Sequence, residues 1–498
     1  MSVYRLVLSF CLGACLLALG GCAANEPQTS ARACLAARAD DFGAVLDCYR
    51  LEQAAEPLQY TQLPSRHFAG VVQRRYALHS QNWSPQNMVQ PSAWQHGVEI
   101  YIPDNARHGK ALLIVNNGVS NPGPDGKVQA ANDLPEEQIL ALVRKTGTIA
   151  VSVSDVPNQF LTFNDDRLPR REDSIVARSW ALFLQDPQQH AFTPLHLPMM
   201  QAVIKTMDLA EQELQPWNVN EFLGTGASKR AWALWLATIA DQRISAVVPL
   251  VLDFMNMRTL FAHTRQAYGG NWPPALQDYH REGITAQLDS AAFDKLERIM
   301  DPLRYLDSPQ AARLALPKYF INAGNDEFFL PDNSRFYFDR LPGQKTMRVV
   351  PNSGHGGIRT VVDEVLTGAI ARWQAGTPWP QLSSALKQEG GHSVLSLQLA
   401  EKPVKLTQWT AVNSQARDFR QPCAIQYVAR DVPWDGSSAL ELPLRPPQQG
   451  WSASFVEARF ADGMVATSQV YVLPDTYPRT PPPPTSAGCS TLGATPAR

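Results

Sequence analysis

Three polar residues, Ser228, Asp326 and His355, occur in settings that suit nucleophilic catalysis. Ser228 stands at a Gly-Ala-Ser-Lys corner between an apolar, strand-like stretch and the start of a helix-like one. A serine hydroxyl becomes a strong nucleophile when a base accepts its proton and an acid orients that base. Asp326 and His355 each follow a predicted buried strand, and glycines flank His355. The order serine, acid, histidine therefore predicts a catalytic triad.

These residues also allow other interpretations. Serine is a favoured N-cap, so Ser228 could simply cap the helix that follows. The usual serine corner has glycine two positions after the serine, where this chain has Arg230. Glu327 is the next choice for the acid, and Asp253, at the end of the preceding predicted strand, is a third.

Catalysis at a carbonyl also needs N–H donors for the developing oxyanion. The apolar run at residues 111–116 predicts a strand buried on both faces, which ends in the loop Asn117-Gly118-Val119. We expect the oxyanion hole to combine the N–H of Lys229 with one N–H from this loop. The cationic side chains at and directly after Lys229 would either favour an acidic substrate or be solvated at the helix start.

The elements that must position these residues alternate between strand and helix across residues 110–375. This alternation predicts a doubly wound, mostly parallel sheet, whose strand ends are where ligands bind. With the order of the polar residues, it indicates an α/β-hydrolase domain over residues 61–380. A helical, aromatic-rich stretch at about 254–315 is expected to form a cap inserted between two strands.

The C-terminal part of the chain has a different pattern. Residues 385–476 contain short alternating segments separated by turn residues, which predicts an Ig/fibronectin-like β-sandwich. The last stretch, residues 477–498, is proline-rich and is expected to form a mobile tail.

The N-terminus has the pattern of a targeting segment. Residues 1–22 combine Arg5, an apolar run and the ending Leu-Gly-Gly-Cys. This ending resembles a bacterial lipobox, in which Cys22 is acylated and becomes the first residue of the mature chain. An ordinary secretory signal cut near Ala23 or Ala24 is the alternative. We expect residues 23–60 to form a tether and a small N-terminal segment, and the protein to be lipid-anchored in a Gram-negative cell envelope, at the outer membrane or in the periplasm.

Four cysteines follow Cys22, and an even number outside the cytosol predicts disulfides. We expect Cys34 to pair locally with Cys48, and Cys423 to pair with Cys489 and tie the tail to the C-terminal domain. The cysteines and histidines lack the spacing of a zinc site, so neither a metal nor another cofactor is expected. The net charge of −2 argues against a nucleic-acid partner and leaves a small molecule or a peptide as the substrate.

Several motifs resemble the PhoPQ-activated pathogenicity-related family, and the resemblance covers most of residues 60–475. They are LHSQNW at 78–83, WQHGVEIYIP at 94–103, VPNQ at 156–159, REDSIVA at 171–177, LPMM at 197–200 and GASKR at 226–230. The resemblance implies an α/β-hydrolase domain related to prolyl oligopeptidases and carbohydrate esterases, followed by a β-domain.

The resemblance also bears on the serine corner. It makes Arg230 part of the family's own version of the corner, although Ala231 stands where the family usually has glycine. The corner is similar to that of glucuronoyl esterases, in which a basic residue directly after the serine assists the oxyanion, and Lys229 would take that role. The charged segment 171–173 would bind a polar substrate group or pair internally with Arg167 and Arg170.

These observations predict a serine hydrolase of ester or peptide bonds that uses Ser228, His355 and Asp326. The alternative is a catalytically inactive protein with a hydrolase fold and a role in binding or in protection against envelope stress.

Overall fold

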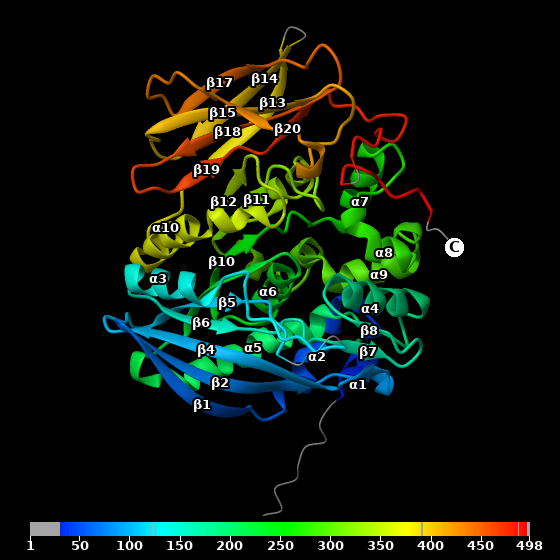
Figure 1. The fold of residues 1–498 in the computed structure, drawn as a ribbon, viewed down its shortest axis with the longest axis vertical. Helices are drawn as coiled ribbons and strands as arrows, with labels where there is room; N and C mark the ends of the chain where they lie inside the picture. Colours follow the sequence, from blue (N-terminus) through cyan, green and yellow to red (C-terminus); the bar gives the residue numbers. More distant parts are fainter. Residues whose placement is uncertain (1–29, 121, 125, 390–391, 487, 496–498) are drawn as a thin grey trace, which may run out of the picture.

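The computed structural model describes residues 30–120, 122–124, 126–389, 392–486 and 488–495. The predicted signal segment, residues 1–22, and the lipidation residue Cys22 lie outside the described residues. Figure 1 shows one large layered unit, with a smaller all-β unit stacked on one end of it.

A nine-stranded sheet organises the larger unit, in the order β1-β2-β4-β6-β5-β9-β10-β11-β12. The first four strands in this order pair antiparallel, and the strands from β6 to β12 pair parallel. The strands are β1 (Gln59–Phe68), β2 (Val71–Asn82), β4 (Ala93–Pro103), β5 (Lys110–Val115), β6 (Ile149–Val153), β9 (Glu221–Ala227), β10 (Ile244–Leu250), β11 (Lys318–Ala323) and β12 (Lys345–Val350). This sheet confirms the predicted α/β-hydrolase fold, but β1 begins inside the stretch expected to be a tether.

Side chains on the two faces of this sheet belong to two separate hydrophobic cores. Along β5, Leu113 and Val115 face one core, while Leu112 and Ile114 face the other, as the alternation of side chains along a strand requires. Helices cover both faces, which explains why the parallel strands are apolar throughout. The first core is covered by α2 (Val45–Ala54), α4 (Asp173–Gln185), α5 (His196–Glu213) and α6 (Lys229–Ala240), and the second by α3 (Glu136–Thr146) and α10 (Val362–Ala375).

Two insertions lie near the carboxyl ends of the parallel strands. Between β10 and β11 the chain forms the predicted helical cap, with α7 (Met257–Ala267), α8 (Gln277–Arg281) and α9 (Ala291–Met300). The other insertion lies between β6 and α4 and contains β7 (Leu161–Phe163) and β8 (Pro169–Arg170). With β3 (Val89–Gln90), these strands form a small antiparallel sheet.

The smaller unit consists of two antiparallel sheets, as predicted for a β-sandwich. One sheet has the order β13-β14-β17, and the other has the order β16-β15-β18-β19, with β20 also paired to β18. The strands are β13 (Leu382–Glu389), β14 (His392–Leu399), β15 (Lys405–Asn413), β16 (Tyr427–Asp431), β17 (Ala439–Leu444), β18 (Trp451–Arg459), β19 (Val465–Thr467) and β20 (Tyr471–Leu473). Leu395 and Phe460 of this unit belong to the second core of the larger unit, so the two units share apolar packing.

Both predicted disulfides form, Cys34–Cys48 and Cys423–Cys489. The first joins α1 (Ala31–Ala37) to α2 at the start of the described chain. The second holds the C-terminal tail, which was expected to be mobile but packs beside α7 (Figure 1). Backbone N–H groups of Trp272 and Leu492 each donate to the other residue's carbonyl oxygen. None of the helices in the described part of the chain has the length and apolar character that crossing a membrane requires.

Candidate active site

Ser228 occupies a strained corner between β9 and α6. Its φ of 55° and ψ of −125° lie in a region that costs residues with a side chain about 1–3 kcal/mol. Two backbone hydrogen bonds fix the corner: Ser228 N–H donates to Leu250 O at 2.8 Å, and Ser228 O accepts from Trp232 N–H at 3.1 Å. The Ser228 side chain makes no capping hydrogen bond to α6 in the described structure. The hydrogen bond that an N-cap role for this side chain would require is therefore not formed.

Two glycines allow β9 and α6 to approach closely. A Cβ on Gly224 would lie 2.5 Å from a Leu234 methyl carbon, and one on Gly226 would lie 3.2 Å from the carbonyl carbon of Arg230. Ala231 is fully buried at the same junction, where the resemblance led us to expect glycine.

His355 and Asp326 form a hydrogen-bonded pair beyond the ends of β12 and β11. Nδ1 of His355 lies 2.9 and 3.0 Å from the two carboxylate oxygens of Asp326. The carboxylate also accepts the N–H of Phe328 at 2.7 Å and that of Phe329 at 3.2 Å, which fixes its orientation. Burial works against a charged imidazole, but the Asp326 carboxylate outweighs it and raises the pKa of His355 above its ordinary value.

The other two acidic residues do not contact the imidazole nitrogens. Glu327 accepts the backbone N–H of His355 at 2.6 Å, so it supports the loop. Asp253 is buried and accepts the Tyr337 hydroxyl, and burial raises its pKa to about 8. Among the three predicted choices, the geometry singles out Asp326 as the partner of His355.

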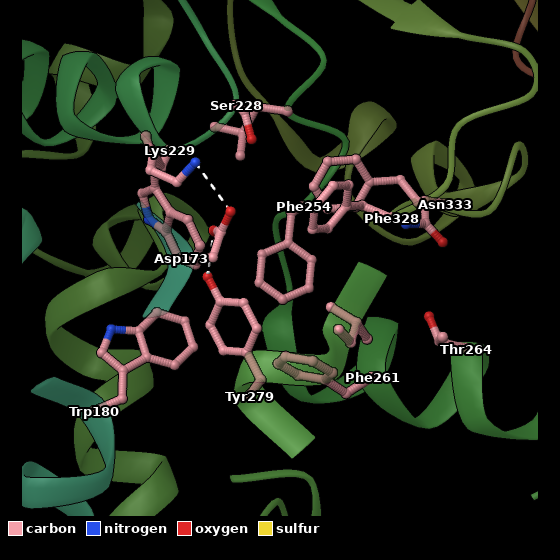
Figure 2. A pocket seen from close by; sticks show the side chains of 14 residues that line it. Asp173, Trp180, Ser228, Lys229, Phe254, Phe261, Thr264, Tyr279, Phe328 and Asn333 are labelled. Carbon is pink, nitrogen blue, oxygen red and sulfur yellow. Dashed lines mark hydrogen bonds and ion pairs between the residues drawn. The ribbon is translucent and has the colours of Figure 1, made fainter. Parts of the chain in front are cut away.

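Ser228 lies between two cavities of different character. The larger one, of about 310 Å³, is polar and is also lined by His355, Arg171 and Arg359. The smaller one, of about 40 Å³, is walled mainly by aromatic rings, and Figure 2 shows these rings gathered below Ser228. His355 lines only the larger of these two cavities. Within the described structure no hydrogen bond joins Ser228 to His355, although both side chains border that cavity.

In the loop predicted to supply an oxyanion donor, two of the three backbone N–H groups already donate hydrogen bonds within the protein. Asn117 N–H donates to the side-chain oxygen of Asn116 at 3.1 Å, and Val119 N–H donates to Gln129 O at 2.8 Å. The N–H groups of Gly118 and Lys229 have no hydrogen-bond partner among the described residues. Of these two, Lys229 lines both cavities, whereas Gly118 is buried and is not among the lining residues of either.

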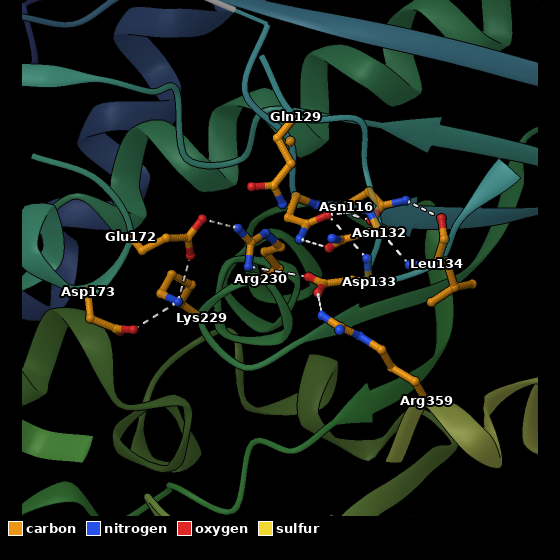
Figure 3. Close-up of polar contacts among 12 residues, drawn as sticks. Asn116, Gln129, Asn132, Asp133, Leu134, Glu172, Asp173, Lys229, Arg230 and Arg359 are labelled. Atoms are coloured by element: carbon orange, nitrogen blue, oxygen red, sulfur yellow. Dashed lines mark hydrogen bonds and ion pairs between the residues drawn. The ribbon is translucent and has the colours of Figure 1, made fainter. Parts of the chain in front are cut away.

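The side chains of Lys229 and Arg230 are buried and paired, so the alternative in which they are solvated at the helix start is wrong (Figure 3). Lys229 Nζ lies 2.9 Å from Glu172 and 3.1 Å from Asp173, and Arg230 lies 2.6 Å from Glu172 and 3.3 Å from Asp133. Burial opposes a charged Glu172, yet Lys229 and Arg230 hold the pKa of this carboxyl well below its ordinary value.

This cluster corrects one expectation, the ionic partners of the 171–173 segment. Asp133 also pairs with Arg359 at 2.9 Å, so three cations face three carboxylates within the cluster, whereas Arg171, which lines the polar cavity, donates to the side chain of Gln129 at 3.3 Å. The partners of the 171–173 segment are Lys229 and Arg230, whereas Arg170 pairs with Asp166 and Glu282.

Two features of the site were missed in the sequence. The rings of Phe328 and Phe329 pack against His355, with centroid distances of 4.6 and 5.8 Å. Asn325 is buried beneath the acid loop, and its side-chain amide donates to Phe419 O and Ile425 O of the C-terminal unit. A Phe-Phe pair next to the acid is visible in the sequence, but the long-range partners of Asn325 leave no local signal.

Comparisons with known proteins identify the family of this chain. Residues 46–420 match the family described as PhoPQ-activated pathogenicity-related protein. Autocrine proliferation repressor protein A of Dictyostelium discoideum is 30% identical over 433 residues, covering 80% of this chain and 85% of that protein. Among solved structures, an acetyl xylan esterase from Paenibacillus sp. R4 has a TM-score of 0.45 at 13% identity and covers 68% of this chain and 94% of that one.

Acetyl Xylan Esterase 1 from Thermoanaerobacterium sp. JW/SL YS485 has a TM-score of 0.40 at 12% identity, with 64% of this chain and 88% of that chain covered. The match over residues 46–420 includes the serine corner, the acid loop and the histidine loop. The chain therefore belongs to the PhoPQ-activated pathogenicity-related protein family and has an α/β-hydrolase fold.

Proposed function

We propose that the protein is a serine hydrolase of ester or peptide bonds. Ser228 would attack the substrate carbonyl, His355 would accept the serine proton, and Asp326 would hold the imidazole in position. The observation that carries the proposal is that a strained serine corner and an Asp-bound histidine border one polar cavity. Structural strain of this kind gathers at functional sites.

The chemistry proceeds in two halves. Attack by Ser228 Oγ forms a tetrahedral oxyanion, for which the N–H groups of Lys229 and Gly118 are the donors. His355 then gives its proton to the leaving oxygen or nitrogen, and an acyl-serine remains. Water, activated by the same imidazole, attacks the acyl-serine and releases the acid. Lys229 thus contributes its backbone, while its side chain keeps Glu172 and Asp173 in place.

An inactive, binding-only protein is the second candidate. The observation that favours it is the missing hydrogen bond between Ser228 and His355 in the described structure. Catalytic hydrogen bonds often form only when substrate is bound, so this single contact leaves the hydrolase as the better supported function.

Ester hydrolysis by matched variants tests the proposal. Wild-type protein and Ser414→Ala, which changes an exposed serine of the C-terminal unit, are expected to hydrolyse 4-nitrophenyl acetate equally. Ser228→Ala is expected to lose at least ~1,000-fold in kcat/KM. Equal rates for all three proteins, each shown to be folded by circular dichroism, would contradict the proposal.

We also propose that the protein acts in the cell envelope, anchored through an acylated Cys22. The two disulfides support this location, because disulfides persist in oxidising compartments.

A further inference from the structure

We infer that the aromatic cavity beside Ser228 receives the acyl part of the substrate and admits only short apolar chains. The protein would then cleave esters of short-chain acids, of about two to four carbon atoms. This inference rests on the proposed hydrolase activity and narrows its substrate class.

The position of His355 indicates which cavity holds the leaving group of the substrate and which holds the acyl chain. The imidazole that accepts the serine proton must deliver it to the leaving oxygen. The leaving alcohol therefore lies in the cavity that His355 borders, which is the larger, polar one. Since Ser228 is common to both cavities, the acyl chain extends into the other cavity, where His355 is not among the lining residues.

The walls of the acyl cavity are rings that pack against one another. Trp180 contacts Trp232 at 5.5 Å, Trp232 contacts Phe254 at 5.3 Å, and Phe254 contacts Phe261 at 5.0 Å between ring centroids, each pair edge to face. All four rings are buried. Moving one ring disturbs the next, because protein interiors are close-packed. We therefore expect the cavity to resist expansion by a longer chain.

The size of the cavity sets the limit on chain length. About 40 Å³ is available, and since one water needs about 10–15 Å³ on this measure, the space suits roughly three non-hydrogen atoms. The atoms of an acetyl, propanoyl or butanoyl group beyond its carbonyl carbon fit this space, whereas those of a hexanoyl group exceed it.

Charged acyl groups find no free partner in this cavity. Its acidic lining residue, Asp173, accepts the Tyr279 hydroxyl at 3.1 Å and pairs with Lys229 Nζ at 3.1 Å (Figure 2). A buried charge without a partner is costly. The cavity thus favours apolar acyl chains over amino-acid side chains that carry charge.

A series of 4-nitrophenyl esters with acetyl, butanoyl, hexanoyl and octanoyl groups tests the inference. Wild-type kcat/KM is expected to fall at least ~10-fold between butanoyl and octanoyl, the range expected for a pocket that rejects extra methylenes. Octanoyl hydrolysis as fast as butanoyl hydrolysis would overturn the inference while leaving the hydrolase intact. An absence of Ser228-dependent hydrolysis for every ester would instead contradict the hydrolase itself.

Paired variants locate the effect in the cavity wall. Phe261→Leu shortens a lining ring and is expected to raise the octanoyl-to-butanoyl ratio about 10-fold. Phe293→Leu is the control, because Phe293 is buried against Phe261 but does not line the cavity. A similar shift in both variants would contradict the assignment. If Phe261→Leu does not fold, Thr264→Leu fills the cavity instead and should raise the acetyl-to-butanoyl ratio, and an unchanged ratio would overturn the inference.

Discussion

At the scale of single residues, the site depends on how His355 is held. Asp326 accepts from Nδ1 and is itself fixed by two backbone N–H groups. In the proposed mechanism, this arrangement leaves Nε2 of His355 as the nitrogen that would exchange protons with Ser228 and the leaving group. The same carboxylate raises the pKa of His355 despite its burial, which links the pair to the pH dependence of activity.

Substitution of the acid should change both the rate and the pH profile. Activity needs the neutral imidazole, so wild-type kcat/KM is expected to fall as pH drops through the raised pKa of His355. Asp326→Asn removes the charge that raises this pKa, so the acidic limb should move to lower pH while kcat falls by about 10⁴-fold. Asp253→Asn, at the alternative acid, should leave the profile and kcat near wild type. A larger loss in Asp253→Asn than in Asp326→Asn would contradict the assignment of the acid.

At the scale of elements, a loop of the C-terminal unit supports the acid loop. Asn325 Nδ2 donates to Phe419 O at 2.6 Å and to Ile425 O at 3.0 Å, while Gln421 N–H donates to Asn325 O at 2.9 Å. Asn325 precedes Asp326 directly, so these bonds fix the backbone from which the acid projects. The Cys423–Cys489 disulfide closes the same loop against the tail.

Removal of this amide should affect stability and catalysis together. Asn325→Ala leaves two backbone carbonyls without their donor, and we expect it to lower the free energy of unfolding by about 1–3 kcal/mol. The kcat should also fall, because Asp326 loses its fixed position. Gln344→Ala is the control, since Gln344 Nε2 donates to Trp379 O at 2.9 Å beside the amino end of β12, the end opposite the histidine loop. Urea unfolding and ester hydrolysis measure the two effects, and an equal loss of kcat in both variants would contradict the support role.

The elements that were predicted differ physically from those that were missed. The buried parallel strands are visible in the sequence as apolar runs, and each predicted catalytic residue follows the end of one such strand. Strand β1 was missed because every one of its residues is exposed or only partly buried, so it lacks an apolar period. Strand β17 contains Pro443, which disfavours a strand assignment. The pairing of Lys229 with Glu172 spans 57 residues, and no local pattern encodes such a contact.

At the scale of the whole molecule, the two units form a continuous structure around the site. Tyr319 of β11 donates its hydroxyl proton to Val465 O of β19, and Thr467 Oγ1 of β19 accepts the N–H of Val349 in β12. The tail returns from the β-unit to the cap, where Tyr477 bonds to His263 of α7. Its proline run suggested mobility, yet the fold provides a surface on which it packs.

The proposed membrane anchor is a property of the whole chain and can be tested apart from catalysis. In a Gram-negative host fed labelled palmitate, wild-type protein and Cys15→Ala are expected to incorporate label, and Cys22→Ala is expected to incorporate none. Several acyl chains give firm membrane binding, so the label should sediment with membranes. Label in Cys22→Ala at the wild-type level would contradict acylation at this cysteine.

The proposed hydrolase activity requires Ser228 to be an activated nucleophile. The most direct measurement is covalent labelling of the folded, wild-type protein with a fluorophosphonate, followed by mass spectrometry of its peptides. We expect one adduct, on the peptide that contains Ser228, formed much more slowly in His355→Ala and absent in Ser228→Ala. If the folded wild-type protein forms no adduct, or forms its adduct at another residue, Ser228 is not the nucleophile.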